Sequence, residues 1–188
     1  MAQPLVLSSS RAVPVDIVTA FQHTLPAPLP SIFRRWYGPI APVKSTSDTE
    51  PPNPAAQNPE APNPEAPNPE TWGHIGQTRT ITQVGGGTMR EELVDVDAPY
   101  SFSYQLTDIT GPLSALISHI GGRWSFKSVG TGTEITWQWR LHPRSKAASY
   151  AFPMVARFWH GYARQALEEL SAVLLADPGY GEPVPHDD

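Results

Sequence analysis

The chain has 188 residues and a formal net charge of −5, and it contains no cysteine. This length is enough for one domain with a sizeable hydrophobic core. The acidic balance and the lack of a Lys/Arg run argue against nucleic-acid binding, and the lack of cysteine excludes disulfides, thiolate chemistry and cysteine zinc sites.

The first part of the chain predicts one strand followed by two short helices. Residues Leu5 to Val13 alternate weakly, and Pro14 favours an extended residue before it and a helix that starts after it. Val15 to Gln22 has an apolar side suited to a short helix, which the Pro-rich run at 25–30 ends. Ser31 to Tyr37 predicts the second short helix.

Residues 43–71 differ sharply in composition, because the motif Asn-Pro-Glu-Ala-Pro repeats there with a period of five from Asn58. Such a segment lacks the apolar residues that offset chain entropy, so we expect a flexible loop inserted into a single domain that spans residues 1–188. The insertion is either a tolerated surface loop or a docking segment for a protein partner. The tail at 177–188 is also expected to be flexible.

Strand patterns resume after Trp72. The predicted strands are Thr78–Val84, Thr88–Val96, Tyr100–Thr107, Ser114–Lys127 and Thr133–Leu141. Glycines at 85–87 make the first two a hairpin, and Gly121-Gly122 indicates a bulge or sharp bend in the fourth. The last strand alternates cleanly and places Ile135, Trp137, Trp139 and Leu141 on one face.

A long C-terminal helix is predicted from Tyr150 to Ala176. One side of it is apolar at helical spacing (Phe152, Val155, Ala156, Trp159, Ala163, Ala166, Leu170, Val173, Leu174), and the opposite side is polar (Arg157, Arg164, Glu168, Ser171). Pro153 requires the regular helix to begin near it. A helix with one apolar side needs a partner surface, and the strands before it supply one.

These elements predict an α+β fold in which a curved antiparallel sheet of six to seven strands wraps around the C-terminal helix, with two short helices after strand one. Turn signals between consecutive strands favour antiparallel pairing. A sheet bent around one helix leaves concave, largely apolar space between the two, as in many sites for small ligands.

Six features of the chain form a recognisable set: Trp36-Tyr37-Gly38-Pro39-Ile40, Gly76-x-x-Arg79, Glu92-Leu93-Val94-x-x-Asp97-x-Pro99, Tyr104, Gly130-Thr-Gly-Thr133 with Trp137, and Trp159-x-x-Tyr162-x-x-Gln165-Ala-Leu167. With the order of elements, this set resembles the SRPBCC superfamily, the helix-grip fold of START lipid-transfer domains, birch-pollen-allergen-like proteins and the polyketide cyclase/dehydrase and lipid-transport group. The resemblance implies an apolar small molecule held between sheet and helix, and it implies no particular chemistry.

Four residues are candidates for catalysis. Arg79 and Glu92 lie on the two arms of the predicted hairpin, where they form either a solvated cross-strand pair or, if buried, a paired charge in the cavity. Resemblance to cyclases implies that Arg79 and Tyr104 polarise or protonate a carbonyl. His119 is a candidate acid or base, or else a structural residue.

Eight residues are predicted to contact a ligand: Trp36, Tyr37, Tyr104, Trp124, Trp137, Trp139, Phe152 and Trp159. For Trp124, Trp137, Trp139 and Trp159, the alternative is that their side chains simply fill the core. No histidine has a second ligand at metal spacing, and no Gly-rich phosphate motif leads into a helix, so we expect neither a metal nor a cofactor.

The leading hypothesis is a binding or carrier protein for a small hydrophobic ligand, either a lipid or a polyketide-like molecule. The alternatives are a cyclase/aromatase or dehydratase-type enzyme that uses the same cavity, and an interaction module that recruits a partner through the Pro-rich loop. The interaction-module hypothesis predicts that deleting residues 51–70 removes a partner without lowering the melting temperature.

The chain lacks 18 consecutive apolar residues and a charged-then-apolar leader, so we expect a cytoplasmic protein without membrane insertion. The oligomeric state stays open.

Overall fold

The structure, a computed structural model, describes residues 3–48 and 72–176. The elements are β1 (Leu5–Val13), α1 (Ile17–Thr24), α2 (Leu29–Ile32), β2 (Val43–Asp48), β3 (Thr78–Gln83), β4 (Thr88–Asp97), β5 (Ser101–Thr107), β6 (Ile117–Val129), β7 (Gly132–Pro143) and α3 (Phe152–Leu175). Short 3-10 helices at Pro112–Ala115 and Ala148–Ala151 precede β6 and α3.

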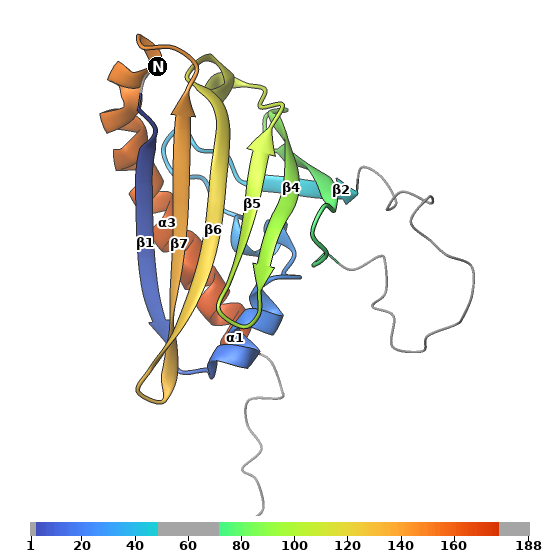
Figure 1. The fold of residues 1–188 in the computed structure, drawn as a ribbon. Coiled ribbons are helices and arrows are strands. Elements are labelled where there is room, and N and C mark those ends of the chain that lie inside the picture. The colour runs from blue at the N-terminus through green and yellow to red at the C-terminus, as the bar shows by residue number, and fades with distance from the viewer. Residues whose placement is uncertain (1–2, 49–71, 177–188) are drawn as a thin grey trace, which may run out of the picture.

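All seven strands belong to one antiparallel sheet with the order β1-β7-β6-β5-β4-β3-β2. Figure 1 shows α3 lying diagonally across one face of this sheet, while β2 at the far edge runs nearly crosswise to β1. The short helices α1 and α2 follow β1 and both contact α3. This arrangement confirms the predicted helix-grip α+β fold.

The face of the sheet that meets α3 comes from the strands with the cleanest alternation. Along β7, the four predicted inward residues Ile135, Trp137, Trp139 and Leu141 are all buried. Trp137 is the centre of this layer, with its ring 5.3 Å from that of Trp159 on α3 and 5.2 Å from that of Phe33. Alternation with period two therefore identified the core face of the sheet.

The helix α3 begins as predicted, with Pro153 in its first turn, where no intrahelical N–H bond is lost. Most of its predicted apolar side is buried, at Phe152, Trp159, Ala163, Ala166, Leu170 and Leu174. Two positions differ from the prediction: Ser171, predicted on the polar side, is buried, and Val173, predicted on the apolar side, is 36% exposed. The contact surface is thus rotated slightly at the C-terminal end of the helix.

The predicted insertion at 43–71 begins too early, because residues 43–48 form β2, which pairs with β3 at the edge of the sheet. The sequence Lys-Ser-Thr-Ser after Val43 lacks apolar alternation, and an edge strand does not require it. The Pro-rich repeats and the predicted tail at 177–188 lie outside the described residues, so both flexibility predictions stay predictions.

The second short helix also differs from the prediction of Ser31 to Tyr37, since α2 ends at Ile32. Beyond it the chain turns sharply, and Tyr37 and Ile40 exchange two backbone hydrogen bonds of 3.1 Å. Gly38 adopts a φ of 55° in this turn, a conformation that favours glycine. The glycine and the following proline make this tight turn directly after the residues that were predicted to be helical.

Gly121-Gly122 was predicted to mark a bulge or a sharp bend, and the bulge is wrong, because both residues pair in regular register with Gln105 and Tyr104 on β5. The register shift of β6 lies instead between Ile117 and His119. Gly122 has a different role: a Cβ atom there would lie 2.0 Å from Cζ of Tyr104. The glycine makes room for the tyrosine ring on the inner face of the sheet.

Candidate functional site

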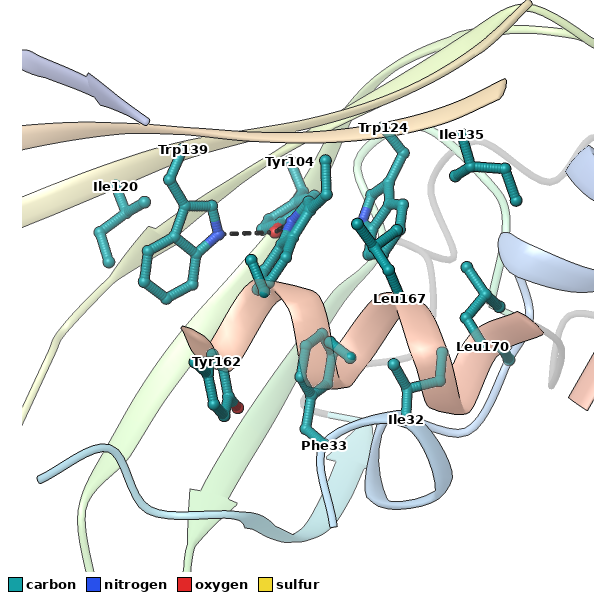
Figure 2. Close-up of a cluster of buried hydrophobic side chains, with 14 of the residues drawn as sticks. Ile32, Phe33, Tyr104, Ile120, Trp124, Ile135, Trp139, Tyr162, Leu167 and Leu170 are labelled. Atoms are coloured by element: carbon teal, nitrogen blue, oxygen red, sulfur yellow. Dashed lines mark hydrogen bonds between the residues drawn. The ribbon is translucent and has the colours of Figure 1, made fainter. Parts of the chain in front are cut away.

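A cavity of about 370 Å³ lies between the sheet, the segment around α2 and the first half of α3. Its walls are mostly apolar. Lining residues from the sheet include Ile81, Met89, Phe102, Tyr104, Leu106, Ile117, Trp124, Trp137 and Trp139, and those from the helical layer include Leu29, Ile32, Phe33, Trp36, Met154, Val155, Trp159 and Tyr162. Figure 2 shows several of these lining residues together with neighbouring core residues, with Phe33 and Tyr162 opposite the indoles of Trp124 and Trp139.

A hydrogen-bonded group of three aromatic side chains forms the polar part of the wall. The Tyr104 hydroxyl accepts a hydrogen bond of 2.8 Å from Nε1 of Trp137. It accepts a second one of 3.0 Å from Nε1 of Trp139 (Figure 2). Burial and the negative charge of Glu91 raise the pKa of Tyr104, and the two indole N–H bonds only partly offset that rise. Tyr104 therefore keeps its proton at neutral pH.

One ion pair also faces the cavity. Nε of Arg79 on β3 donates a 2.5 Å hydrogen bond to Oε2 of Glu91 on β4, and both side chains are at most 7% exposed. The guanidinium carbon of Arg79 lies 3.9 Å from the centroid of the Trp72 ring, a cation–π contact. Burial raises the pKa of Glu91, and the adjacent charge and hydrogen bond of Arg79 oppose that rise.

The partner of Arg79 is thus Glu91, and the predicted pairing with Glu92 is wrong. The register of the β3–β4 hairpin places Arg79 opposite Glu91 and Thr78 opposite Glu92. Glu92 is not part of the cavity lining. A shift of one residue along a strand moves a side chain to the other face, so the error in register exchanged the two glutamates.

His119 also lies away from the cavity lining. Its ring stacks on that of His142 with the centroids 4.0 Å apart, and its Nδ1 lies 3.1 Å from Oγ of Ser118. Partial burial, then the charges of His119 and Arg140, lower the pKa of His142. Of the four predicted catalytic candidates, the structure therefore brings Arg79 and Tyr104 to the cavity and places Glu92 and His119 elsewhere.

Six of the eight residues predicted to contact a ligand line the cavity: Trp36, Tyr104, Trp124, Trp137, Trp139 and Trp159. The other two do not. Phe152 is buried in the core, and the ring of Tyr37 packs on Gly161 of α3, where a Cβ atom would lie 1.8 Å from Cζ of Tyr37. Tyr37 therefore anchors the turn after α2 to α3.

Sequence reasoning missed three lining residues of functional interest, Trp72, Glu91 and Tyr162. The alternation of Met89, Glu91 and Leu93 on β4 was a usable signal, since all three are buried on the same face. Tyr162 is buried on α3, and its pKa is raised by burial and by Tyr104. No comparable pattern pointed to Trp72.

The described segments contain neither a cluster of metal-ligating side chains nor a membrane-spanning helix. Across residues 3–48 and 72–176, no three histidine, aspartate or glutamate side chains gather closely enough to hold a metal ion. None of the described helices is long and apolar enough to cross a membrane.

Comparison with known proteins agrees with this architecture. Among solved structures, ginseng major latex-like protein 151 from Panax ginseng is similar with a TM-score of 0.60 at 14% identity, covering 93% of this chain and 99% of that one. Ara h 8.0201 is similar with a TM-score of 0.58 at 12% identity, covering 93% and 99%. Protein Ms6760 from Mycobacterium smegmatis is similar with a TM-score of 0.54 at 18% identity, covering 92% of each chain.

These identities are low, so the structural matches show a shared fold and nothing about ligands. No curated protein sequence matches the chain. The sequence model of the family described as polyketide cyclase/dehydrase and lipid transport matches residues 46–175, from β2 to the end of α3. The chain therefore belongs to the polyketide cyclase/dehydrase and lipid transport family of the SRPBCC superfamily.

Proposed function

We propose that this protein binds and carries a small hydrophobic molecule, a lipid or a polyketide-like compound, in the cavity between the sheet and α3. The observation that carries the proposal is the cavity itself, about 370 Å³ in volume and walled mainly by aliphatic and aromatic side chains. Its size lies in the range of small-molecule sites, roughly 300–1,000 Å³.

The apolar walls supply a sufficient driving force for binding. A ligand that buries about 250 Å² of apolar surface gains roughly 6 kcal/mol from the hydrophobic effect, before the costs of association. Two polar features of the wall, the Tyr104 hydroxyl and the Arg79–Glu91 pair, are already held by other side chains. Most of the affinity therefore comes from the apolar walls, and the polar groups orient the ligand.

A cavity-filling variant tests the proposal. Ile81 is buried in the lining, so Ile81→Trp places extra bulk inside the cavity. Val94, on the neighbouring strand β4, is 38% exposed and lies outside the lining, so Val94→Trp adds comparable bulk outside it. Fluorescence titration with an uncharged naphthalene dye is expected to show binding to the wild type and to Val94→Trp, and at least about tenfold weaker binding to Ile81→Trp. Equal affinity for all three proteins would contradict the proposal.

A cyclase- or dehydratase-type reaction is the second candidate function, favoured by the presence of both Arg79 and Tyr104 in the cavity lining. Arg79 is neutralised by Glu91 and covered by Trp72, which limits its ability to stabilise an enolate. Incubation with a poly-β-keto thioester distinguishes the two functions. Cyclisation that is faster with wild type than with Tyr104→Phe supports an enzyme, and equal rates support a carrier.

Recruitment of a protein partner through the Pro-rich segment remains a separate proposal. Its repeats lie outside the described residues, and deletion of residues 51–70 followed by partner recovery is its test.

A further inference from the structure

The hydrogen-bonding capacity of Tyr104 indicates what the cavity can recognise. A tyrosine hydroxyl has one proton and can accept two hydrogen bonds. The indoles of Trp137 and Trp139 both donate to this oxygen, at 2.8 Å and 3.0 Å. Both acceptor positions of the Tyr104 hydroxyl are therefore occupied. Its proton remains, so toward a ligand in the cavity this hydroxyl can act only as a donor.

A second donor lies in the same wall. Trp159 is fully buried on α3 and lines the cavity, and its indole N–H makes no hydrogen bond within the described part of the chain. Its ring packs against the rings of Trp137 and Trp139, with centroids 5.3 Å and 6.0 Å apart, so it contacts the two side chains that hold the Tyr104 hydroxyl. A buried N–H group without an acceptor costs free energy, and an acceptor on a ligand removes that cost.

The charges in the wall bear on the ionic state of the ligand. Among the described lining residues only Arg79 and Glu91 carry charge, and they neutralise each other. The lining therefore offers no unpaired cation to a carboxylate or a phosphate. The charge of Glu91 also acts on Tyr104 in the direction that disfavours a nearby anion, and burying an unpaired charge is costly.

We propose that the ligand is uncharged and presents a carbonyl-type oxygen, such as that of a ketone or an ester, to the donor pair formed by Tyr104 O–H and Trp159 N–H. This inference rests on the proposed carrier function and narrows it to a ligand class. Neutral carbonyl compounds are then expected to bind more tightly than two other classes. Plain hydrocarbons leave both donors without an acceptor, and fatty-acid anions meet no unpaired cation in the cavity wall.

Three fluorescent probes that share the same dimethylaminonaphthalene core provide the test. The first, propionyl-dimethylaminonaphthalene, is a neutral ketone, and the second is its propyl analogue, in which a methylene replaces the carbonyl. The third, dimethylaminonaphthoate, is a carboxylate. The propyl-to-ketone ratio of dissociation constants is measured for wild type and Trp159→Phe. Loss of one net hydrogen bond is expected to lower this ratio about three- to tenfold in Trp159→Phe.

Trp124→Phe is the matched control, because Trp124 lines the same cavity and its ring stacks on Trp137 at 5.3 Å. This variant is expected to weaken the ketone and the propyl analogue alike and to keep their ratio within about twofold of the wild-type value. The naphthoate is expected to bind wild type at least about tenfold more weakly than the ketone.

A measurement on wild type decides the question if Trp159→Phe does not fold. The carbonyl stretch of the bound, isotope-labelled ketone is expected at lower frequency than in hexane, because the oxygen accepts hydrogen bonds. A stretch at the hexane position, an unchanged ratio in a folded Trp159→Phe, or tighter binding of the naphthoate would overturn this inference and leave the carrier proposal standing. Failure of all three probes to bind wild type would overturn both.

Discussion

The missing side chain at Gly122 gives the Tyr104 ring its place in the cavity wall. Gly122 pairs directly with Tyr104 across β6 and β5, and a Cβ atom there would lie 2.0 to 2.5 Å from three atoms of the ring. The next residue, Gly121, has ordinary space around it, with Cβ of Arg140 at 3.9 Å. Two adjacent glycines of one strand thus have different structural roles.

Alanine substitution at these two positions is a matched test of that role. Gly122→Ala is expected to lower the free energy of unfolding by about 1–3 kcal/mol, because the ring must move in a packed interior and strain its two indole bonds. Gly121→Ala is expected to be neutral or slightly stabilising. Urea denaturation measures both. Equal stability of the two variants would contradict the packing described for Tyr104.

The stacked pair His119–His142 predicts a dependence of stability on pH. The pKa of His142 is lowered from its ordinary value of 6.5, first by burial and then by the charges of His119 and Arg140. As the pH falls below 6.5, the unfolded chain takes up the proton more readily than the folded one, so this contribution to stability is present above 6.5 and is lost on acidification.

We therefore expect the urea midpoint of wild type to decrease as the pH is lowered from 7 to 5. In His142→Gln this decrease is expected to be smaller. His74 is exposed in the loop before β3, so His74→Gln serves as the control and is expected to follow wild type. The same pH dependence in His142→Gln and wild type would contradict the assignment.

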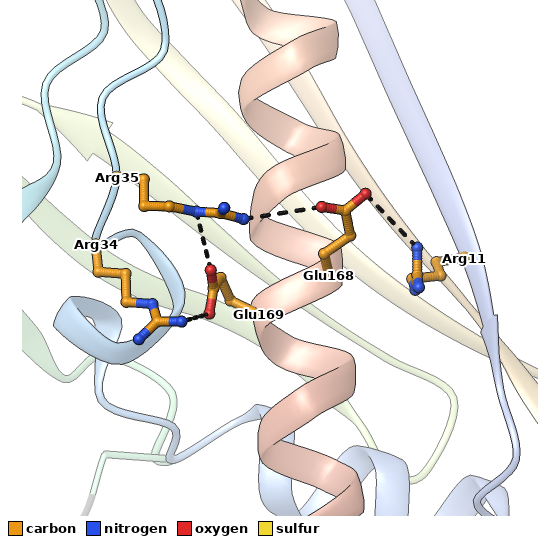
Figure 3. Close-up of polar contacts among 5 residues, drawn as sticks. All are labelled: Arg11, Arg34, Arg35, Glu168 and Glu169. Carbon is orange, nitrogen blue, oxygen red and sulfur yellow. Dashed lines mark ion pairs between the residues drawn. The ribbon is translucent and has the colours of Figure 1, made fainter.

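At the scale of elements, a chain of ion pairs ties the segment after α2 to the last long helix. Glu169 of α3 lies 2.5 Å from Arg34 and 2.9 Å from Arg35, measured between carboxylate oxygens and guanidinium nitrogens. Glu168 lies 3.8 Å from Arg35 and 4.0 Å from Arg11 of β1 (Figure 3). The segment held this way forms one wall of the cavity.

The two glutamates are expected to differ in importance because they differ in exposure. The side chain of Glu169 is 10% exposed and that of Glu168 is 42% exposed. Glu169→Gln is expected to lower the free energy of unfolding by about 1–2 kcal/mol, since it weakens two contacts of a nearly buried group. Glu168→Gln is expected to change it by less than about 0.5 kcal/mol. Comparable losses in both variants would show that burial does not set their contribution.

The sequence predicted elements well where local periodicity was strong. In β7 the alternation identified both the strand and its inner face, and most of α3 followed from its apolar stripe. The edge strand β2 was missed because an exposed edge needs few apolar residues. Hydrophobic periodicity arises from the side chains that a segment buries. An edge strand that buries few side chains therefore shows no such pattern and is not predicted.

Register and long-range packing explain the errors in the site. Trp124, Trp137 and Trp139 reached the cavity because the strand face alone decides their position. Glu91 was missed because the register of β3 against β4 depends on the hairpin loop. The glycines at 85–87 do not determine that register to within one residue. The pairing of Tyr104 with Gly122 joins separate strands, and no local pattern predicts such a contact.

At the scale of the whole molecule, the fold produces a hollow because one helix cannot fill a sheet that curves around it. The core is dense where β7 meets α3 through Trp137 and Trp159, and it opens toward β3 and β4, where the segment after α2 covers the sheet. The four tryptophans predicted either to fill the core or to line a cavity do both: Trp124, Trp137, Trp139 and Trp159 are buried and line the cavity.

Native mass spectrometry of the freshly purified full chain tests the carrier function most directly. We predict that the wild-type protein, with a chain mass of 20.5 kDa, carries an additional uncharged apolar molecule or takes up the naphthalene ketone one-to-one on incubation. Ile81→Trp is expected to lose this added mass, and Val94→Trp to keep it. A wild-type protein that stays at its chain mass before and after incubation would contradict the account.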